Sequence, residues 1–356
     1  MFARTAALGT LLFGLFSSGC DAGKSTLVPS NDPQRDPTDE GSDQDLGSGD
    51  DVLDQTPVER HGHLKVVGTQ LQNESGEPVQ LKGVSSMWLN WEPDGYAENP
   101  DALRWMRNNW NLTVIRAAMG VEEDQAYTTY PDVAKQQVYR IVDNAIEAGV
   151  YVIVDFHSHK AHEYQDVAIE FFSELAASYA GVPNLIYETF NEPVGIGWTD
   201  LKVYHEAVVA AIREQDEEAP IVLGTPNYSQ DVDQAAVDPV AGHNLLYTLH
   251  YYACTHKGSL RSKGDVALQL GAALFVTEFG ATHADGGRDG IVCLDEAQRW
   301  DDWLRNRGVS WSAWKLDNCE QDSSCLLNPD APLDGGWTSE HLHGHAPFVR
   351  GRMQAD

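Results

Sequence analysis

The chain has 356 residues, of which 54 are acidic and 24 are basic, so its formal net charge is −30. A field of this sign repels the phosphates of nucleic acids and of anionic membrane surfaces, and we therefore expect no nucleic-acid partner. The length suits one large catalytic domain and is typical of α/β barrels.

The first twenty residues have the pattern of an export signal. A short charged start is followed by an apolar run from Ala6 to Phe16, which is too short to span a bilayer, and by small residues that end at Cys20. A cysteine directly after small residues resembles a bacterial lipoprotein signal, so we expect lipid on Cys20. Ser17 stands where such signals usually carry Leu, which leaves cleavage without lipid as the alternative. The protein is expected outside the cytoplasm, with a membrane contact only through this lipid.

Residues 21–60 are rich in Asp, Ser, Gly, Pro and Gln and have few large apolar side chains, which predicts a disordered acidic linker. Residues 61–356 would then form the catalytic domain, which we expect to be a monomer.

Strand-like runs recur about every 25 to 40 residues in this domain, separated by stretches with helical spacing of apolar positions. Their interiors are nearly continuous apolar residues, as parallel strands covered on both faces require. The runs are Val79–Ser86, Leu112–Met119, Val150–His157, Leu185–Pro193, Ile221–Asn227, Leu245–Ala253, Leu274–Ala281 and Ser310–Asp317. This alternation predicts an α/β fold, a (β/α)8 TIM barrel. Ahead of it, Leu64–Val67 and Gln70–Val79, with a turn signal at Asn73–Gly76, predict a small N-terminal β-hairpin that caps the barrel.

Polar side chains gather at the downstream ends of these runs, where a barrel carries its chemistry. They are Arg116, His157, Asn191, Glu192, His250, Tyr252, Glu278 and Trp314. A barrel would bring all of them to one mouth.

Two of these residues, Glu192 and Glu278, are the acids that cleavage of a glycosidic bond needs. Their strands would face each other across a narrow mouth, so we expect the short separation of a retaining enzyme. Arg116 would keep Glu278 ionised, and burial next to Glu278 would raise the pKa of Glu192, the proton donor. Asn191 could bind the sugar's 2-hydroxyl, and Trp314 could stack on a sugar ring.

Cys254, Cys293, Cys319 and Cys325 remain after Cys20, and an even number in an exported chain favours disulfides. Cys319 with Cys325 would close a short loop and Cys254 with Cys293 would join two loops, although sequence does not fix the connectivity. Metal-binding spacings such as Cys-x-x-Cys are missing from the sequence, so we expect no metal. His159 and His162 are interpreted as solvated loop residues rather than a metal pair.

An ordered set of motifs makes a family resemblance specific. The motifs are Asn191-Glu-Pro193, Val276-Thr-Glu-Phe-Gly280, Val114-Ile-Arg-Ala-Ala-Met119, Leu249-His-Tyr-Tyr252 and Asp155-Phe-His157. Together they resemble glycoside hydrolase family 5, in its subfamily of bacterial endo-β-1,4-glucanases. The resemblance implies a retaining cellulase-type enzyme without cofactor or metal, with a β-glucan as substrate. It implies Glu192 as acid/base and Glu278 as nucleophile.

The resemblance also has departures. Met87-Trp-Leu-Asn-Trp-Glu92 replaces a segment in which relatives carry a tyrosine at the position of Glu92, and Cys319 and Gln321 replace a lysine and a glutamate that hold a glycone sugar. Trp91 is expected to be a sugar platform, and Tyr228 stands where a tryptophan is frequent on the leaving-group side. These changes keep open a mannan, xyloglucan or mixed-linkage glucan hydrolase. An alternative of another class is a non-catalytic surface lipoprotein that captures glycans in the same groove.

Overall fold

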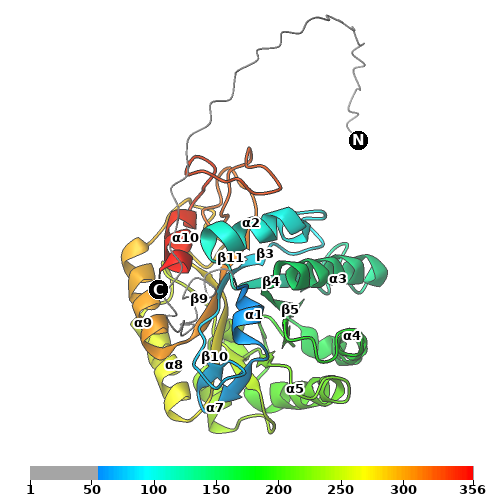
Figure 1. Ribbon diagram of the computed structural model, residues 1–356. Helices are drawn as coiled ribbons and strands as arrows, with labels where there is room; N and C mark the ends of the chain where they lie inside the picture. The colour runs from blue at the N-terminus through cyan, green and yellow to red at the C-terminus, as the bar shows by residue number, and fades with distance from the viewer. Residues whose placement is uncertain (1–54, 356) are drawn as a thin grey trace, which may run out of the picture. The chain divides into compact units, whose positions relative to one another are not determined.

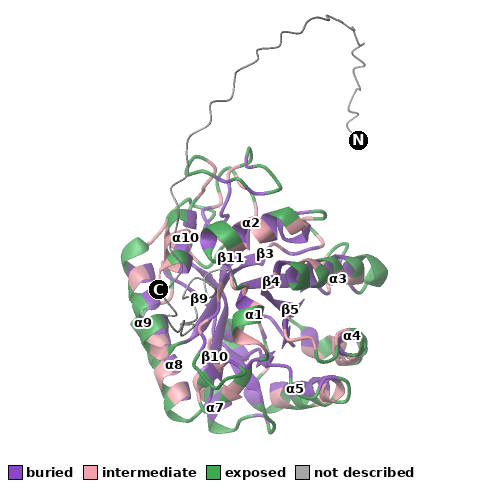
Figure 2. Cartoon of the chain, viewed as in Figure 1, coloured by how far each residue is buried: buried purple, intermediate pink, exposed green. Residues whose placement is uncertain are grey.

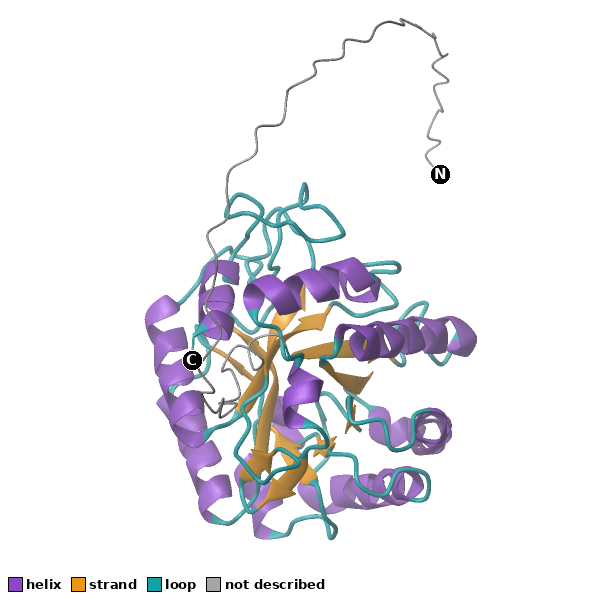
Figure 3. Cartoon of the chain, viewed as in Figure 1, coloured by secondary structure: helices purple, strands orange, loops and turns teal. Residues whose placement is uncertain are grey.

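The structure, a computed structural model, describes residues 55–355. Its centre is one closed parallel sheet, in which β11 pairs with both β3 and β10 (Figures 1 and 3). Counting β8 and β9 as two segments of one run, the nine β-segments make the eight strands of a (β/α)8 barrel. The segments are β3 (Lys82–Ser86), β4 (Val114–Gly120), β5 (Tyr151–His157), β6 (Leu185–Glu188), β7 (Ile221–Leu223), β8 (Leu245–Thr248), β9 (Tyr251–Tyr252), β10 (Leu274–Gly280) and β11 (Ser310–Leu316). The predicted fold is confirmed.

Helices surround the sheet (Figure 3). The longer ones are α2 (Pro100–Trp110), α3 (Pro131–Ala148), α4 (Gln165–Ser178), α5 (Trp198–Arg213), α8 (Gly258–Gln269), α9 (Leu294–Arg307) and α10 (Ala346–Gln354). Shorter ones are α1 (Pro57–His61), α6 (Pro226–Ser229), α7 (Val232–Val237) and the 3₁₀ turns η1 (Tyr96–Glu98) and η2 (Ala161–Tyr164). Among these described helices, none is both long and apolar enough to cross a membrane.

The strands are covered on both faces, as their continuous apolar runs predicted. Every residue of β4, β5, β10 and β11 is buried, and the centre of the barrel is accordingly purple in Figure 2. Helix α3 shows how the outer layer is fixed: its first turn carries Pro131, and its last turn ends at Gly149 in the left-handed conformation that favours glycine.

Three strands, β6, β7 and β8, end several residues before their predicted runs, and two of these early ends bear on the site. Strand β6 stops at Glu188, so Glu192 lies in the following loop rather than at the strand end. The sixth run is interrupted between β8 and β9, where the amide of His250 donates to the carbonyl of Ser229 at 2.8 Å instead of joining the ladder with β10. Such irregularities are common next to active sites, where they redirect a side chain.

The N-terminal hairpin is present and plugs the amino-terminal end of the barrel. Strand β1 (Lys65–Val67) pairs with β2 (Gln70–Gln72), so the tight turn is at Gly68 and Thr69. The predicted turn at Asn73–Gly76 instead makes a second reversal, closed by the Asn73 amide on the carbonyl of Glu77 at 2.9 Å. Leu64 and Leu71 of this segment share one buried cluster with lumen residues such as Tyr151 and Phe275.

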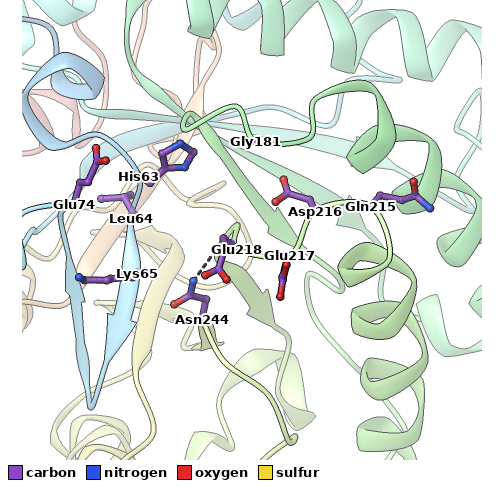
Figure 4. Close-up of a pocket in the computed structure, with 10 residues that line it drawn as sticks. All are labelled: His63, Leu64, Lys65, Glu74, Gly181, Gln215, Asp216, Glu217, Glu218 and Asn244. Carbon is purple, nitrogen blue, oxygen red and sulfur yellow. Dashed lines mark hydrogen bonds between the residues drawn. The ribbon is translucent and has the colours of Figure 1, made fainter.

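A hollow of about 460 Å³ opens beside the hairpin (Figure 4). Lys65 of β1 lines it together with segments that precede strands, Gln215–Glu218 before β7 and Asn244 before β8. It therefore lies at the amino-terminal ends of the strands and contains none of the predicted site residues.

The expected signal at residues 1–20, lipidation of Cys20, and most of the linker fall outside the described residues. Within the rest of the expected linker, Thr56 and Glu59 form a capping box that starts α1 at Pro57. Val58 ties this helix to the domain by donating to the carbonyl of Gly149 at 3.0 Å. Helical structure thus begins a few residues before His61.

Both expected disulfides form. Cys254 bonds Cys293 with Cα atoms 5.2 Å apart, and Cys319 bonds Cys325 with Cα atoms 5.8 Å apart. The first links the loop after β9 to the residue before α9, and the second closes a short loop after β11. Both therefore restrain loops at the carboxyl ends of strands.

The two disulfides should contribute unequally to stability, because a longer closed loop removes more entropy from the unfolded chain. The bonds span 39 and 6 residues of sequence. We expect the Cys254→Ser/Cys293→Ser double variant to lose about 4 kcal/mol of unfolding free energy and the Cys319→Ser/Cys325→Ser variant about 2 kcal/mol. Urea unfolding of both variants measures this, and an equal or inverted order would contradict the loop-length account.

Candidate active site

The site is organised around the guanidinium of Arg116, which β4 places inside the barrel mouth with a side chain 0% exposed. Its Nη2 lies 2.9 Å from Oδ2 of Asp155, its Nε 2.7 Å from Oε2 of Glu188, and its Nη1 3.2 Å from Oε2 of Glu278. Nη2 also donates to Oδ1 of Asn191 at 2.7 Å. One cation thus joins acids from strands β5, β6 and β10.

Three buried carboxyls around one guanidinium leave an excess of negative charge, which protonation relieves. Burial raises the pKa of Asp155 to about 7, against the opposing effect of Arg116. The same residue accepts from Nδ1 of His157, whose pKa burial and Arg116 lower to about 3. His157 is therefore a neutral ring held in one orientation.

Glu278 accepts hydrogen bonds on both oxygens. Tyr252 donates its hydroxyl to Oε1 at 2.6 Å, and Arg116 donates to Oε2 at 3.2 Å. An arginine does not lose its proton in proteins, and burial raises the pKa of Tyr252 well above its usual value, with Glu278 adding to the effect. Both neighbours keep the protons with which they donate. Donors of this kind favour the ionised form of a carboxyl, which is the form that a nucleophile needs.

Glu192 has a different pair of neighbours, two imidazoles. Its Oε1 lies 2.9 Å from Nδ1 of His250, and its Oε2 lies 3.3 Å from Nε2 of His159. The other nitrogen of His250 is 2.9 Å from the hydroxyl of Thr277, which itself donates to Oε1 of Glu188 at 2.5 Å. Since that hydroxyl proton is committed to Glu188, Nε2 of His250 is the donor to Thr277, and Nδ1 faces Glu192.

The predicted rise in the pKa of Glu192 is wrong for this arrangement. Burial does raise it, but hydrogen bonds from His159 and His250 outweigh burial and lower the pKa to about 2. The pKa of His250 is raised in turn: burial lowers it, but its bond to Glu192 prevails. Sequence could not anticipate two imidazoles on one carboxyl, and groups bonded this closely titrate together.

The two glutamates face each other across the mouth. Ligand atoms of Glu192, His250 and Glu278 all lie within 4.8 Å of one another, so a carboxyl oxygen of each glutamate is within that distance of the other. This is close to the separation of about 5 to 5.5 Å between the two carboxyl groups of retaining glycosidases, and shorter than that of inverting ones. A cavity of about 460 Å³ adjoins both glutamates, His250 and Tyr252.

Aromatic rings flank this pair. Trp314 stacks on His157 with ring centres 5.4 Å apart. Trp88 makes an edge contact with His157, with ring centres 4.3 Å apart, and stacks on Trp91 at 4.8 Å. Trp91 is 48% exposed and Tyr228 is 45% exposed, so both offer free ring faces. Trp91 follows the first barrel strand and Tyr228 the fifth, which lie on opposite sides of an eight-stranded barrel.

All of the residues predicted for the site therefore lie at the barrel mouth. Sequence reasoning missed Glu188 and Asp155, although each is an acid inside an otherwise apolar run, and it interpreted His159 as a solvated loop residue. The signal for Glu188 was present in Leu185-Ile-Tyr-Glu188, because a buried charge in a strand needs a partner.

Glu192, His250 and Glu278 are residue types that could also approach a metal ion. Their facing atoms are already hydrogen-bonded to one another or to Tyr252 and Arg116. The expectation that the chemistry needs no metal stays a prediction.

Comparison with known proteins agrees with this geometry. The family model for cellulase (glycosyl hydrolase family 5) matches residues 72–320. An endoglucanase of Clostridium saccharobutylicum is 40% identical over 295 residues, covering 81% of this chain and 64% of the relative. Endoglucanase N of Pectobacterium atrosepticum is 40% identical over 309 residues, covering 85% of this chain and 68% of the relative.

Among solved structures, the catalytic domain of Thermobifida fusca endoglucanase Cel5A superposes with a TM-score of 0.80 at 32% identity, covering 85% of this chain and 100% of that domain. A variant of that domain has also been solved in complex with cellotetraose. A catalytic (β/α)8 barrel with paired glutamates is what the fold and the site define. The chain belongs to glycosyl hydrolase family 5, the cellulase family.

Removing the cation should be costly, because buried carboxyls would lose their partner. We expect Arg116→Met to lower the free energy of unfolding by about 3 to 5 kcal/mol at pH 7. The loss should shrink toward pH 5: without the guanidinium the folded-state pKa values of its partners rise, so protonation relieves them as pH falls.

The matched control is Arg104→Met. Arg104 is 40% exposed and pairs with Asp101 and Glu147, both exposed, so its loss should cost no more than about 1 kcal/mol. Urea unfolding compares the two variants, and similar losses for both would refute the central role of Arg116.

Proposed function

We propose that this chain is a retaining, endo-acting hydrolase that cleaves β-1,4-glucosidic bonds in cellulose or related β-glucans. The observation that carries the proposal is the approach of Glu192 and Glu278 to within 4.8 Å at the mouth of a family 5 barrel. The endoglucanase relatives and the cellotetraose complex of the Thermobifida fusca domain support the substrate class. The chain spans 64% of the clostridial relative's length, so the activity rests on the site rather than on a whole-length match.

The neighbours of each glutamate support a different role for it. Glu278, held by donors that keep their protons, attacks the anomeric carbon. Glu192, in contact with imidazoles that exchange protons near neutrality, gives a proton to the leaving oxygen. The products of this step are a glycosyl ester on Glu278 and a shortened chain. A water molecule then attacks the anomeric carbon, returns a proton to Glu192 and frees the carboxylate of Glu278, so the β configuration is retained.

The residues around the glutamates are suited to binding the sugars on either side of the cleaved bond. Asn191, held by Arg116, is placed to bind the 2-hydroxyl of the sugar that is cleaved, and Trp314 with its stacked His157 gives that sugar an apolar face. Trp91 and Tyr228, on opposite sides of the barrel, support sugar binding on both sides of the cleaved bond. A groove with platforms on both sides favours cleavage within a chain, with the polysaccharide as the partner of a monomeric enzyme.

A second candidate keeps the chemistry and changes the substrate to mannan, xyloglucan or mixed-linkage glucan. The observation that favours it is the altered glycone side. Glu92, where relatives carry tyrosine, has a pKa of about 8, raised by burial and then by Asp317. Cys319 is tied to Cys325 and cannot replace the missing lysine. A sugar bound at this end of the groove meets acids and a disulfide, beside the ring of Trp91.

Product analysis on cellohexaose and mannohexaose distinguishes these candidates. We expect the wild type to cut cellohexaose internally and to leave mannohexaose intact, and Glu278→Gln to reduce turnover to the uncatalysed background because the ester cannot form. Products from mannohexaose alone would refute the glucanase proposal. Binding of cellohexaose without any turnover by the wild type would instead favour the glycan-capturing lipoprotein.

We further propose that the protein is exported and attached to the membrane by lipid on Cys20, with residues 21–54 as a spacer. The two disulfides and the export pattern of residues 1–20 support export. In a bacterial host, full-length protein should partition into the detergent phase of a Triton X-114 extract, and Cys20→Ala should move it to the aqueous phase. Aqueous partitioning of both would refute lipidation and leave cleavage without lipid.

A further inference from the structure

His159 lies against Glu192, although nothing in its sequence context marks it as part of the site. The backbone fixes this placement: the amide of Glu192 donates to the carbonyl of Ser158, and the amide of Val194 donates to the carbonyl of His159, each at 3.2 Å. The loops after β5 and β6 are thus joined in register. This puts Nε2 of His159 at 3.3 Å from Oε2 of Glu192.

The two imidazoles on Glu192 differ in their access to solvent. The side chain of His250 is 2% exposed and its far nitrogen is committed to Thr277, whereas the side chain of His159 is 37% exposed. The ring centre of His159 is 6.0 Å from that of Tyr228 and 6.1 Å from that of Trp88. A leaving sugar that rests on Tyr228 therefore also meets His159.

The charged surroundings favour a proton on His159. The hydrogen bond to Glu192 raises its pKa, against burial, and Glu192, Glu278 and Glu122 add electrostatic support. Glu122, from the loop after β4, also accepts from the amide of His159 at 3.2 Å. The titratable and aromatic groups that face His159 from the neighbouring loops are thus Glu122, His157, Glu192, Glu278, Tyr228 and Trp88.

We propose that His159 is a positioning residue for Glu192: it fixes Oε2 of the carboxyl and stores on Nε2 the proton that the carboxyl delivers to the leaving oxygen. The inference rests on the proposed hydrolase function. When the leaving sugar enters, the proton passes from Nε2 to the carboxyl and then to the glycosidic oxygen as its bond to the anomeric carbon breaks. The water that cleaves the ester returns a proton to Glu192, so the cycle needs no other donor.

The test compares His159→Gln and His159→Phe with the wild type on two substrates. Cellohexaose has a poor leaving group that needs the proton, whereas 2,4-dinitrophenyl β-cellobioside has a good one that does not. We expect kcat/KM on cellohexaose to fall about 10-fold in both variants, a fraction of the roughly 10²- to 10⁴-fold that general acid catalysis supplies. On the dinitrophenyl substrate the fall should be about 2-fold or less.

The pH profile gives an independent readout. Because His159 helps to retain the shared proton as pH rises, its loss should move the alkaline limb of kcat/KM on cellohexaose to lower pH by about one unit. His162→Gln is the matched control, since His162 lies three residues further along the chain, in η2, and stacks on Phe190 with ring centres 6.0 Å apart. It should leave both the leaving-group ratio and the profile unchanged.

Equal losses of kcat/KM on both substrates in both His159 variants would overturn the proposal, because the residue would then only shape the cavity and not help the proton transfer. An unchanged alkaline limb would overturn it as well. Absence of turnover by the wild type on both substrates would count against the hydrolase function itself, so the two failures are distinguishable.

Discussion

Burying one guanidinium among three carboxyls is the constraint from which the site follows. Arg116 is 0% exposed, and a cation in that position is tolerable only if hydrogen-bonded anions surround it. Asp155, Glu188 and Glu278 supply those anions from three strands that are distant in sequence. The same contacts that compensate the charge therefore fix the positions of the strand ends, and with them the direction in which Glu278 points.

The roles that we propose for the two glutamates rest on the groups that donate hydrogen bonds to each. Glu278 is bound by Arg116 and Tyr252, which retain their protons across the ordinary pH range. Glu192 is bound by imidazoles, the side chains whose protons move most readily near neutrality. Thr277 and Glu188 connect the neighbours of Glu192 to those of Glu278, because the Thr277 hydroxyl accepts a hydrogen bond from His250 and donates one to Glu188. A single network thus joins a carboxyl held by an arginine and a tyrosine to a carboxyl held by two imidazoles.

Much of the fold was predictable, because parallel strands covered on both faces appear in the sequence as apolar runs. In a barrel, the carboxyl ends of all strands also lie at one mouth. That logic found Arg116 and Glu278, whereas the even number of cysteines in an exported chain predicted the two disulfides. It failed where loops pair with loops: the position of His159 depends on backbone bonds between residues 158–159 and 192–194, which no periodicity encodes. It also missed Glu188: the charge within an apolar run indicated a buried partner, but only the structure shows that this partner is Arg116, two strands away.

The stereochemistry of the first sugar released tests the central claim most directly, because carboxyl oxygens within 4.8 Å leave no room for water between the nucleophile and the sugar. Proton NMR of cellohexaose hydrolysis, recorded before the anomers equilibrate, reports it. The account predicts that the new reducing ends appear first as the β-anomer. Initial appearance of the α-anomer would mean a single displacement by water and would contradict the roles of Glu278 as nucleophile and Glu192 as acid/base.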